Sequence, residues 1–387
     1  MDIVRKAQKY QDSIHFEIGQ PDLTPSPKVK KALLEAIDND RFSYTESLGL
    51  LSLREKISNM YKENYNVDIE SSRILLTPGT SGAFLVAYTL TLNNNENLGL
   101  SDPSYPCYKN FASMLDINPT FMNIDKSTNY ELTIKHLEKV NIQALQISSP
   151  SNPTGNLYSK ENLKELLLYC KEKNIAFISD ELYHGLTYEK NAHTALEFSD
   201  DVFIINGFSK YYCMPGMRLG WIIVPKSLTR EAEKIAQNIF ISAPTLSQYA
   251  ALEAFDKDYL NDIKNTFKKR RDYLYKELSL IFDIDAKPDG AFYLWANVSK
   301  FTDDSFKFAE ELLENPEETI RSAEIAIEHF DLPKYKESNQ EFNFRVINLP
   351  KTQKLRISSI RSEHLGKFLS FEGTVRMKST VRPRITT

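Results

Sequence analysis

The chain has 387 residues, of which 41% are hydrophobic and 26% charged, and its formal net charge is −4. A chain of this length and ordinary composition can form two to three domains with a sizeable core, which excludes a peptide or a lone small module. The nearly balanced charge indicates no particular class of partner.

The beginning of the chain carries no recognisable targeting signal. Its first residues lack the continuous apolar core of a signal peptide, and no segment approaches the length of about 18 apolar residues that a membrane span needs. The three cysteines, Cys107, Cys170 and Cys213, are too few and too scattered for a disulfide framework or a metal-ligand pattern. We therefore expect a cytoplasmic protein with no membrane partner and no metal.

The first 230 residues predict an α/β fold, because helical patterns alternate with short apolar runs that end in turns or polar clusters. Helices are expected at Ala83–Leu90 and, with clear amphipathic spacing, at Lys160–Lys173. An open sheet of this kind binds ligands at the carboxyl ends of its strands. The strands are expected at residues 74–76, 98–100, 144–147, 175–178 and 202–205.

The residues just after three of these strands carry candidate chemistry. Thr77–Gly82 opens a helix with free backbone N–H groups that suit a phosphate, although an ordinary helix cap explains the same residues. Ser148–Gly155 can point the amide of Asn152 into a cleft, with a plain Asn-Pro turn as the alternative. Ser179–Tyr183 places Asp180 at a strand end, where a helix N-cap is the alternative.

The segment Asn206–Gly220 follows the last of these strands and contains Lys210 and Arg218. Most lysines are solvated surface residues, so Lys210 alone indicates little. Together with Asp180 and the turn at residues 77–82, however, the segment supplies an amine nucleophile, an acid and phosphate anchors. Pyridoxal phosphate chemistry needs these parts for its Schiff base, its pyridine nitrogen and its phosphate.

Five motifs occur in order along the chain, and together they resemble the class I and II aminotransferases of the fold-type I pyridoxal phosphate family. The resemblance runs from about Phe16 to Leu313. It implies a fold-type I large domain with an incomplete small domain, and a pyridoxal-phosphate-dependent aminotransferase acting on an amino acid and a 2-oxo acid. The motifs are Gly19-Gln20-Pro21-Asp22, Asp102-Pro103-Ser104-Tyr105-Pro106, Asn152-Pro153-Thr154-Gly155, Asp180-Glu181-Leu182-Tyr183, and Ser209-Lys210 with Arg218-Leu219-Gly220.

The resemblance implies three catalytic residues. Lys210 would hold the cofactor as an internal aldimine and then move the proton between the substrate's α carbon and the cofactor. Asp180 would pair with the pyridine nitrogen and keep it protonated. Tyr183, together with Asn152, would hydrogen-bond the cofactor's phenolic oxygen and so fix the orientation of the ring.

The resemblance also implies how the cofactor and substrate are held. Tyr105 would stack on one face of the cofactor ring and Leu182 would pack on the other. Tyr44 would reach the phosphate bound by a partner subunit, which implies a homodimer. Gly19 and Asn152 would contact the substrate. The phosphate would lie against residues of two segments: Gly79, Thr80, Ser81, Ser209 and Arg218.

The chain departs from the family pattern in two regions. Gly207 stands where many relatives have a serine, which removes one expected phosphate donor, and Cys213 replaces a small residue. After Leu313 we find neither the expected Gly-Pro-containing loop nor the strand whose arginine grips the substrate carboxylate. Arg356 is an alternative candidate for that arginine.

A reversal of charge marks the C-terminal region. Asp303–Glu337 has eleven acidic residues against four basic ones, whereas Lys351–Thr387 has nine basic against two acidic. Phe344–Pro350 and the stretch from Leu355 to Arg384 resemble the N-terminal region of archaeal minichromosome maintenance helicases, which implies a helical segment and a partial OB-like barrel. No nucleotide-binding Gly-x-x-x-x-Gly-Lys-Ser/Thr motif occurs, so we expect at most nucleic-acid contact through the basic tail.

The sequence therefore predicts four segments: an N-terminal piece at 1–30 that joins the small domain, a large cofactor-binding domain at 31–250, a partial small domain at 251–313, and a helicase-like segment at 314–387. The leading interpretation is an aminotransferase. A lyase or decarboxylase of the same fold, and an inactive fusion protein with weak nucleic-acid binding, remain alternatives.

Overall fold

The computed structural model divides into two compact units, Gln20–Ala296 and a second unit made of Met1–Gly19 with Asn297–Thr387. The helices and the large sheet described below belong to the first unit. The structure describes residues 19–301, 303–304, 354–356 and 370–372.

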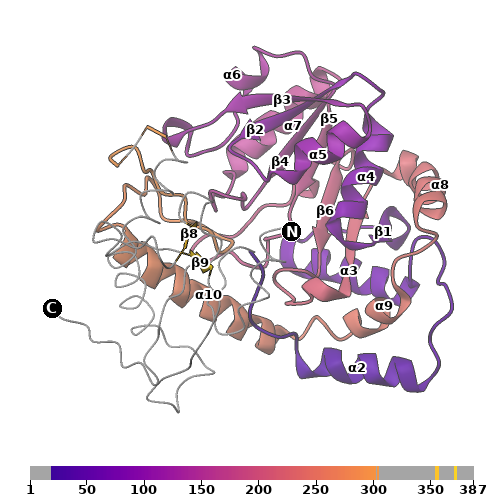
Figure 1. The fold of residues 1–387 in the computed structure, drawn as a ribbon. Helices are drawn as coiled ribbons and strands as arrows, with labels where there is room; N and C mark the ends of the chain where they lie inside the picture. Colours follow the sequence, from indigo (N-terminus) through magenta and orange to yellow (C-terminus); the bar gives the residue numbers. More distant parts are fainter. Residues whose placement is uncertain (1–18, 302, 305–353, 357–369, 373–387) are drawn as a thin grey trace, which may run out of the picture. The chain divides into compact units, whose positions relative to one another are not determined.

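A seven-stranded sheet forms the centre of the first unit (Figure 1). Its strands lie in the order β1-β7-β6-β5-β4-β2-β3, and β7 runs antiparallel to both of its neighbours while the other pairs are parallel. Mixed sheets with one antiparallel strand are common in α/β proteins. The strands are β1 Ile74–Thr77, β2 Asn97–Asp102, β3 Asn118–Asn123, β4 Ala144–Ser148, β5 Ala176–Asp180, β6 Phe203–Gly207 and β7 Gly220–Ile223.

Helices pack on both faces of the sheet (Figure 1). Helices α3, α7 and α9 contribute to the apolar cluster on one face, and α4, α5 and α8 to the cluster on the other. The helices are α2 Pro27–Asp38, α3 Leu51–Tyr65, α4 Gly79–Thr91, α5 Cys107–Met114, α6 Ile134–Leu137, α7 Lys160–Glu172, α8 Thr229–Ile239, α9 Thr245–Ala251 and α10 Lys257–Leu278. Short 3₁₀ turns lie at Ser71–Arg73, Lys126–Thr128, Ala195–Glu197, Pro215–Met217 and Lys226–Leu228.

The central strands are apolar because both of their faces are covered. In β1, Ile74 and Leu76 pack into one cluster and Leu75 into the other, as alternation along a strand requires. In β6, Ile204 packs against the first cluster and Ile205 against the second. All residues of β4 are buried, which explains why this strand reads as a continuous run rather than an alternating one.

The structure confirms the predicted α/β fold and adds two strands. Each strand expected from the sequence is present, but β3 and β7 were not expected. Helix α4 begins at Gly79, four residues before the expected start at Ala83. Most of the predicted helicase-like segment at 314–387 lies outside the described residues. Its described part consists of β8 Lys354–Arg356 and β9 Ser370–Glu372, which pair in parallel.

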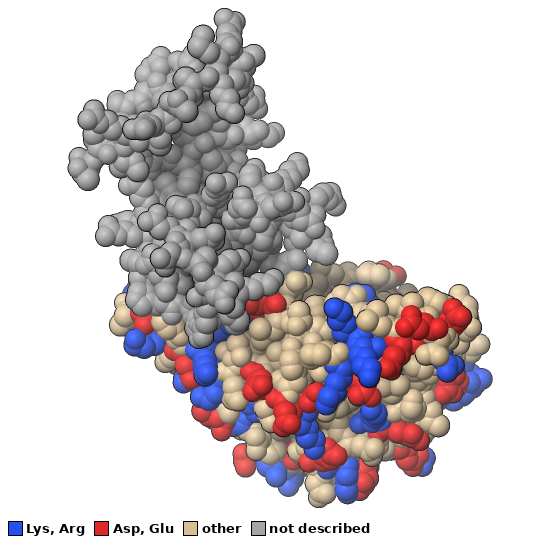
Figure 2. Space-filling model, turned by 90° about the horizontal axis from the view of Figure 1, so that it is seen from below, with Lys and Arg blue, Asp and Glu red and all other residues tan. Residues whose placement is uncertain are grey.

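Surface charge is mixed on the face of the molecule shown in Figure 2, where basic and acidic side chains are interspersed among uncharged ones. Within the part of the chain that the structure describes, no helix is long and apolar enough to cross a membrane.

Candidate active site

Three neighbouring parallel strands bring the candidate residues to one edge of the sheet. β4, β5 and β6 are adjacent and parallel, so their carboxyl ends lie side by side. Asp180 is the last residue of β5, while Asn152 and Lys210 follow β4 and β6 within a few residues. The backbone links two of these strand ends directly, because the Ser149 N–H donates to the Asp180 carbonyl over 3.1 Å.

Lys210 lies among aromatic rings. Its Nζ is 5.5 Å from the centre of the Phe292 ring and 6.0 Å from that of Tyr183. Burial, assisted by the positive charge of Arg218, lowers the pKa of Lys210 to about 8, although Asp180 acts in the opposite direction. An amine with this pKa is unprotonated far more often at neutral pH than an exposed lysine, so it can serve as a nucleophile and a base.

Asp180 is buried, with only 5% of its surface exposed, and both of its carboxylate oxygens accept hydrogen bonds. The Tyr108 hydroxyl donates to Oδ2 over 2.5 Å, and the Leu182 N–H donates to Oδ1 over 3.1 Å. Burial raises the pKa of Asp180 to about 6, and these two donors and Lys210 limit the rise. The carboxylate is therefore ionised at neutral pH and favours a cation placed beside it.

Three polar side chains converge near Lys210. The Tyr293 hydroxyl lies 2.6 Å from the Tyr183 hydroxyl and accepts a hydrogen bond from Asn152 Nδ2 over 3.4 Å. Burial raises the pKa of Tyr183 well above its ordinary value, so its hydroxyl keeps its proton. The two hydroxyls and the amide can all donate, and the cluster therefore suits an oxygen acceptor.

The start of α4 and Arg218 form a second part of the site. A Cβ added at Gly79, which has a φ of +68°, would lie 2.5 Å from Arg218 Nη2, so the guanidinium packs directly on this glycine. A Cβ added at Gly220 would lie 2.9 Å from the Thr80 backbone nitrogen. The first N–H groups of a helix have no partner within the helix, and a guanidinium beside them completes a site for an anion such as phosphate.

The other residues expected at the phosphate end lie close to this cradle in the chain. Ser81 is in the first turn of α4, and Ser209 is buried directly before Lys210. At Gly207, where the family pattern has a serine, a Cβ would lie 3.1 Å from Thr80 Cγ2 and close to the β7 backbone. The glycine therefore fits a space that leaves little room for a side chain.

The remaining expected residues have less direct placements. The Tyr105 ring lies edge-on to Tyr108, with ring centres 5.3 Å apart, and so adjoins the tyrosine that holds the Asp180 carboxylate. Leu182 packs with the apolar cluster that contains Tyr183. Tyr44 lies in the loop between α2 and α3 and is 77% exposed. Gly19 belongs to the second compact unit.

Glu181, which follows Asp180 in the chain, lies beside the buried His184, and the sequence did not indicate either residue as functional. Glu181 is fully buried, and its Oε1 accepts hydrogen bonds from the Ser179 and Thr194 hydroxyls and the Ala195 N–H, each 3.0–3.1 Å away. Its Oε2 lies 3.4 Å from His184 Nδ1. Burial raises the pKa of Glu181 to about 8 and lowers that of His184 to about 3, so both are neutral at pH 7.

Two further residues were missed because they come from distant parts of the chain. Tyr108 is 72 residues from Asp180, and Tyr293 is 110 residues from Tyr183. Nothing in the sequence around Tyr293 pointed to a contact with Tyr183. Nothing in the sequence around Tyr108 pointed to a contact with an acid.

The arrangement suits an aromatic cofactor that carries an anionic group. It combines an amine, a carboxylate, a group of hydrogen-bond donors and an anion cradle at one edge of the sheet. In the described part of the chain, no group of three or more His, Cys, Asp or Glu side chains could hold a metal ion.

The chain matches a known protein family over most of its length. The family model described as aminotransferase class I and II matches residues 11–327. The match starts before Phe16 and ends after Leu313, the limits expected from the sequence, so it includes the first part of the segment that resembles helicases. The helicase resemblance of the rest of that segment stays a prediction.

Individual relatives cover most of the chain. The (5-formylfuran-3-yl)methyl phosphate transaminase of Methanocaldococcus jannaschii is 36% identical over 327 residues, which are 81% of this chain and 84% of the relative. The valine–pyruvate aminotransferase of Mycobacterium tuberculosis is 32% identical, with 80% of this chain and 81% of the relative covered. The crystal structure of an aminotransferase from Mycobacterium tuberculosis superimposes with a TM-score of 0.76 at 32% identity, covering 81% of this chain and 83% of that one.

Proposed function

The chain belongs to the class I and II aminotransferases, and on that basis we propose that it uses pyridoxal 5′-phosphate, held at Lys210, to move an amino group between an amino acid and a 2-oxo acid. When bound, this cofactor supplies a ring that withdraws electrons from the substrate's α carbon. The observation that carries the proposal is the position of the Lys210 amine, with its lowered pKa, at the same sheet edge as the Asp180 carboxylate.

The other described residues fit this cofactor. The contact of Arg218 with Gly79, and of Gly220 with the start of α4, leaves a cradle of backbone N–H groups and one guanidinium for the phosphate. Asn152 and Tyr183 supply two donors for the phenolic oxygen. These residues would hold the ring at both ends, and the orientation they fix would decide which bond of the α carbon reacts.

Lys210 has two roles in this proposal. Its unprotonated amine would hold the cofactor through the aldehyde carbon, with the aldehyde oxygen lost as water. Once a substrate amine has taken that place, the freed Lys210 amine would accept the proton of the substrate's α carbon and donate it to the carbon of the cofactor that held the aldehyde. A pKa of about 8 suits both roles, because the group both loses and regains a proton readily near neutral pH.

Asp180 keeps a proton on the ring nitrogen. An ionised carboxylate beside a pyridine nitrogen favours the cationic form, and the cation attracts electrons more strongly than the neutral ring. The Tyr108 hydroxyl and the Leu182 N–H fix the direction of the carboxylate and stabilise its charge in a buried place. Both donors therefore affect catalysis indirectly, by holding and stabilising the Asp180 carboxylate.

We also propose a homodimer in which Tyr44 reaches the partner's phosphate site. Phe42, Tyr44 and Leu51 are 62%, 77% and 50% exposed, which is unusual for large apolar and aromatic side chains so close together in the sequence. Mixing Tyr44→Ala and Lys210→Ala subunits, each inactive alone, should restore about a quarter of wild-type activity, because half of the dimers are hybrids with one intact site. A mixture that stays inactive, although co-purification of two differently tagged subunits shows that hybrid dimers have formed, would refute this role of Tyr44.

The first test of the proposed function is the absorption spectrum of the protein with pyridoxal phosphate. We expect a band at about 400–430 nm that Lys210→Ala lacks and that a suitable amino acid removes. The matched control is Lys226→Ala, which replaces an exposed lysine that pairs with Glu70. Because the relatives are named for different substrates, the amino acids should be screened as a panel.

Each result has a definite meaning. A 2-oxo acid formed from the amino acid, with a second 2-oxo acid accepting the amino group, supports the aminotransferase. Loss of a substituent or of CO₂ without transfer to an acceptor would instead identify a lyase or decarboxylase. A wild-type protein without the Lys210-dependent band would refute the proposal.

A further inference from the structure

The segment Pro288–Tyr293 passes between the loop that follows β4 and the loop that follows β5. The Gly290 N–H donates to the Gly155 carbonyl over 2.9 Å, and the Ala291 N–H donates to the Leu186 carbonyl over 2.8 Å. Gly155 belongs to the first loop and Leu186 to the second. The backbone of this segment, which we call the strap, therefore ties together the loops that carry Asn152 and Tyr183.

The strap packs tightly against the loop after β4 and the loop after β5. A Cβ added at Gly290 would lie 2.6 Å from Pro150 Cγ and 2.7 Å from the Leu186 carbonyl oxygen. At Gly155, whose φ is +73°, a Cβ would lie 2.6 Å from Pro288 Cβ. The two glycines thus allow three segments to come into direct contact.

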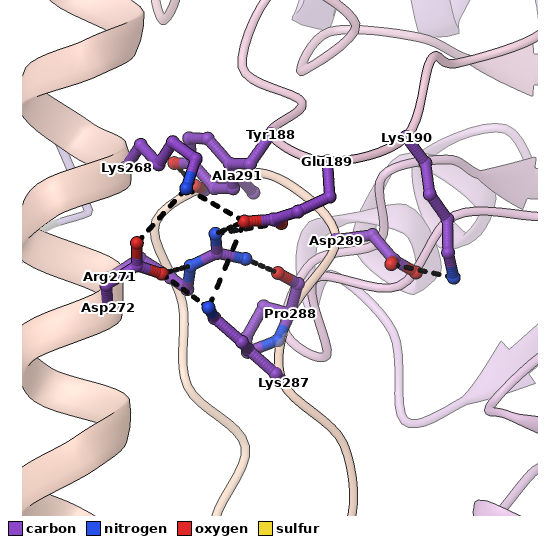
Figure 3. Close-up of polar contacts among 10 residues, drawn as sticks. All are labelled: Tyr188, Glu189, Lys190, Lys268, Arg271, Asp272, Lys287, Pro288, Asp289 and Ala291. Carbon is purple, nitrogen blue, oxygen red and sulfur yellow. Dashed lines mark hydrogen bonds and ion pairs between the residues drawn. The ribbon is translucent and has the colours of Figure 1, made fainter.

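Arg271 of α10 also holds the strap in place (Figure 3). Its buried guanidinium donates to the Pro288 carbonyl and to both carboxylate oxygens of Glu189, the latter over 2.7 and 2.9 Å. The same guanidinium lies 4.4 Å from the centre of the Tyr188 ring, and the Tyr188 hydroxyl donates to the Ala291 carbonyl. One side chain therefore fixes both the strap and the loop after β5.

The end of the strap enters the candidate site. Phe292 stacks on Phe267 of α10, with ring centres 5.3 Å apart, and its ring also faces Lys210 Nζ. The next residue, Tyr293, places its hydroxyl 2.6 Å from that of Tyr183 and within reach of the Asn152 amide. The strap thus sets the Tyr293 hydroxyl beside the two donors that the proposed function assigns to the cofactor's phenolic oxygen.

We propose, building on the proposed function, that Tyr293 is a positioning residue that supports Tyr183 as a donor to the cofactor, and that Arg271 holds it there through the strap. In this proposal the Tyr293 hydroxyl donates a hydrogen bond to the Tyr183 oxygen, and the Tyr183 hydroxyl donates one to the phenolic oxygen. A hydroxyl that accepts a hydrogen bond becomes a stronger donor, particularly where water is excluded. Tyr293 acts on the cofactor through Tyr183 in this arrangement.

The measurable consequence is a change in how the bound cofactor titrates. Stronger donation to the phenolic oxygen would draw off its negative charge and so make the nearby Lys210 nitrogen, which would bond the cofactor, easier to deprotonate. Removing the Tyr293 hydroxyl should therefore raise the pH midpoint of that titration. The titratable groups that face the pair are Asp180 from β5, Tyr105 from the loop after β2, and Lys210 itself.

The test compares Tyr293→Phe with the wild type as complexes with pyridoxal phosphate. The pH midpoint of the absorbance change should move up by about half a unit to one unit, which corresponds to one weakened hydrogen bond. The cofactor dissociation constant, measured by fluorescence, should also rise. Tyr130→Phe is the control, because it removes a hydroxyl that bonds Asp285 over 2.6 Å, and its midpoint should match the wild type.

Unchanged midpoints in Tyr293→Phe, or an equal shift in Tyr130→Phe, would overturn the proposal. Arg271→Lys keeps the charge but loses the planar fork, so it should shift the midpoint in the same direction. Combined with Tyr293→Phe, it should add nothing further, and additive shifts would refute the role of the strap. A wild-type protein that forms no Lys210-dependent band would instead refute the proposed function.

Discussion

Replacing Glu181 by glutamine should change how the stability of the protein depends on pH. Glutamine keeps a side-chain oxygen for the three donors that Glu181 Oε1 accepts from, and places an amide in the position of Oε2 near His184. Burial raises the pKa of Glu181 from 4.5 to about 8. Between these pH values the folded protein holds a proton that the unfolded chain has released.

The sign of the effect follows from this proton. A carboxyl group whose pKa is raised on folding stabilises the protein at low pH, and this contribution is lost as the pH rises from 4.5 toward 8. At about 1.4 kcal/mol for each pH unit, the free energy of unfolding of the wild type should fall by about 3 kcal/mol between pH 5 and pH 8 relative to Glu181→Gln. Other titrating groups are common to both proteins and cancel in the difference.

Urea unfolding at pH 5, 6.5 and 8, followed by circular dichroism, measures this difference. Glu165→Gln, the same substitution at an exposed position of α7, is the matched control. If the difference between the wild type and Glu181→Gln is the same at all three pH values, Glu181 is ionised throughout and the argument from burial is wrong.

Three further predictions concern the cofactor site. Asp180→Asn removes the charge but keeps the shape, so kcat should fall by at least about 100-fold and cofactor affinity much less, and an equal loss in both would contradict the assigned role. Arg218→Gln should weaken pyridoxal phosphate binding by at least about 10-fold in a fluorescence titration, while unchanged affinity would place the phosphate elsewhere. Gly220→Ala brings a Cβ to 2.8 Å from the Gly79 carbonyl carbon and should lower stability by about 1–3 kcal/mol in thermal unfolding; Gly216→Ala, with open space around it, should not.

The fold could be predicted wherever both faces of a strand are covered. β4 and β6 are buried throughout and so appear in the sequence as apolar runs. β3 was missed because it lies at the edge of the sheet, contains Pro119 and is largely exposed, which leaves no apolar pattern. β7 was missed because its four residues, Gly220–Ile223, follow directly on the segment that carries Lys210 and Arg218 and give no separate signal.

The candidate site, too, could be predicted only in part from the sequence. Lys210, Asp180 and Asn152 each follow a predicted strand, so their gathering at one edge follows from the topology of a parallel sheet. The contacts that Tyr108 and Tyr293 make depend on how α5 and the strap pack, and no local pattern encodes contacts between residues so far apart in the chain. The resemblance to a family named the residues expected to touch the cofactor and missed those that hold them in place.

Asp180 and Glu181 show why such supporting residues matter. The two acids are consecutive, and neighbours in an extended chain point to opposite sides, so Asp180 bonds Tyr108 while Glu181 bonds Thr194. If both were ionised, each would raise the pKa of the other and weaken the charge that Asp180 offers to a cation. Burial keeps Glu181 protonated up to a pH of about 8, which leaves Asp180 as the ionised member of the pair beside Lys210. The stability change expected for Glu181→Gln therefore reports whether Glu181 is protonated, and it is this protonation that leaves Asp180 as the one ionised acid of the pair.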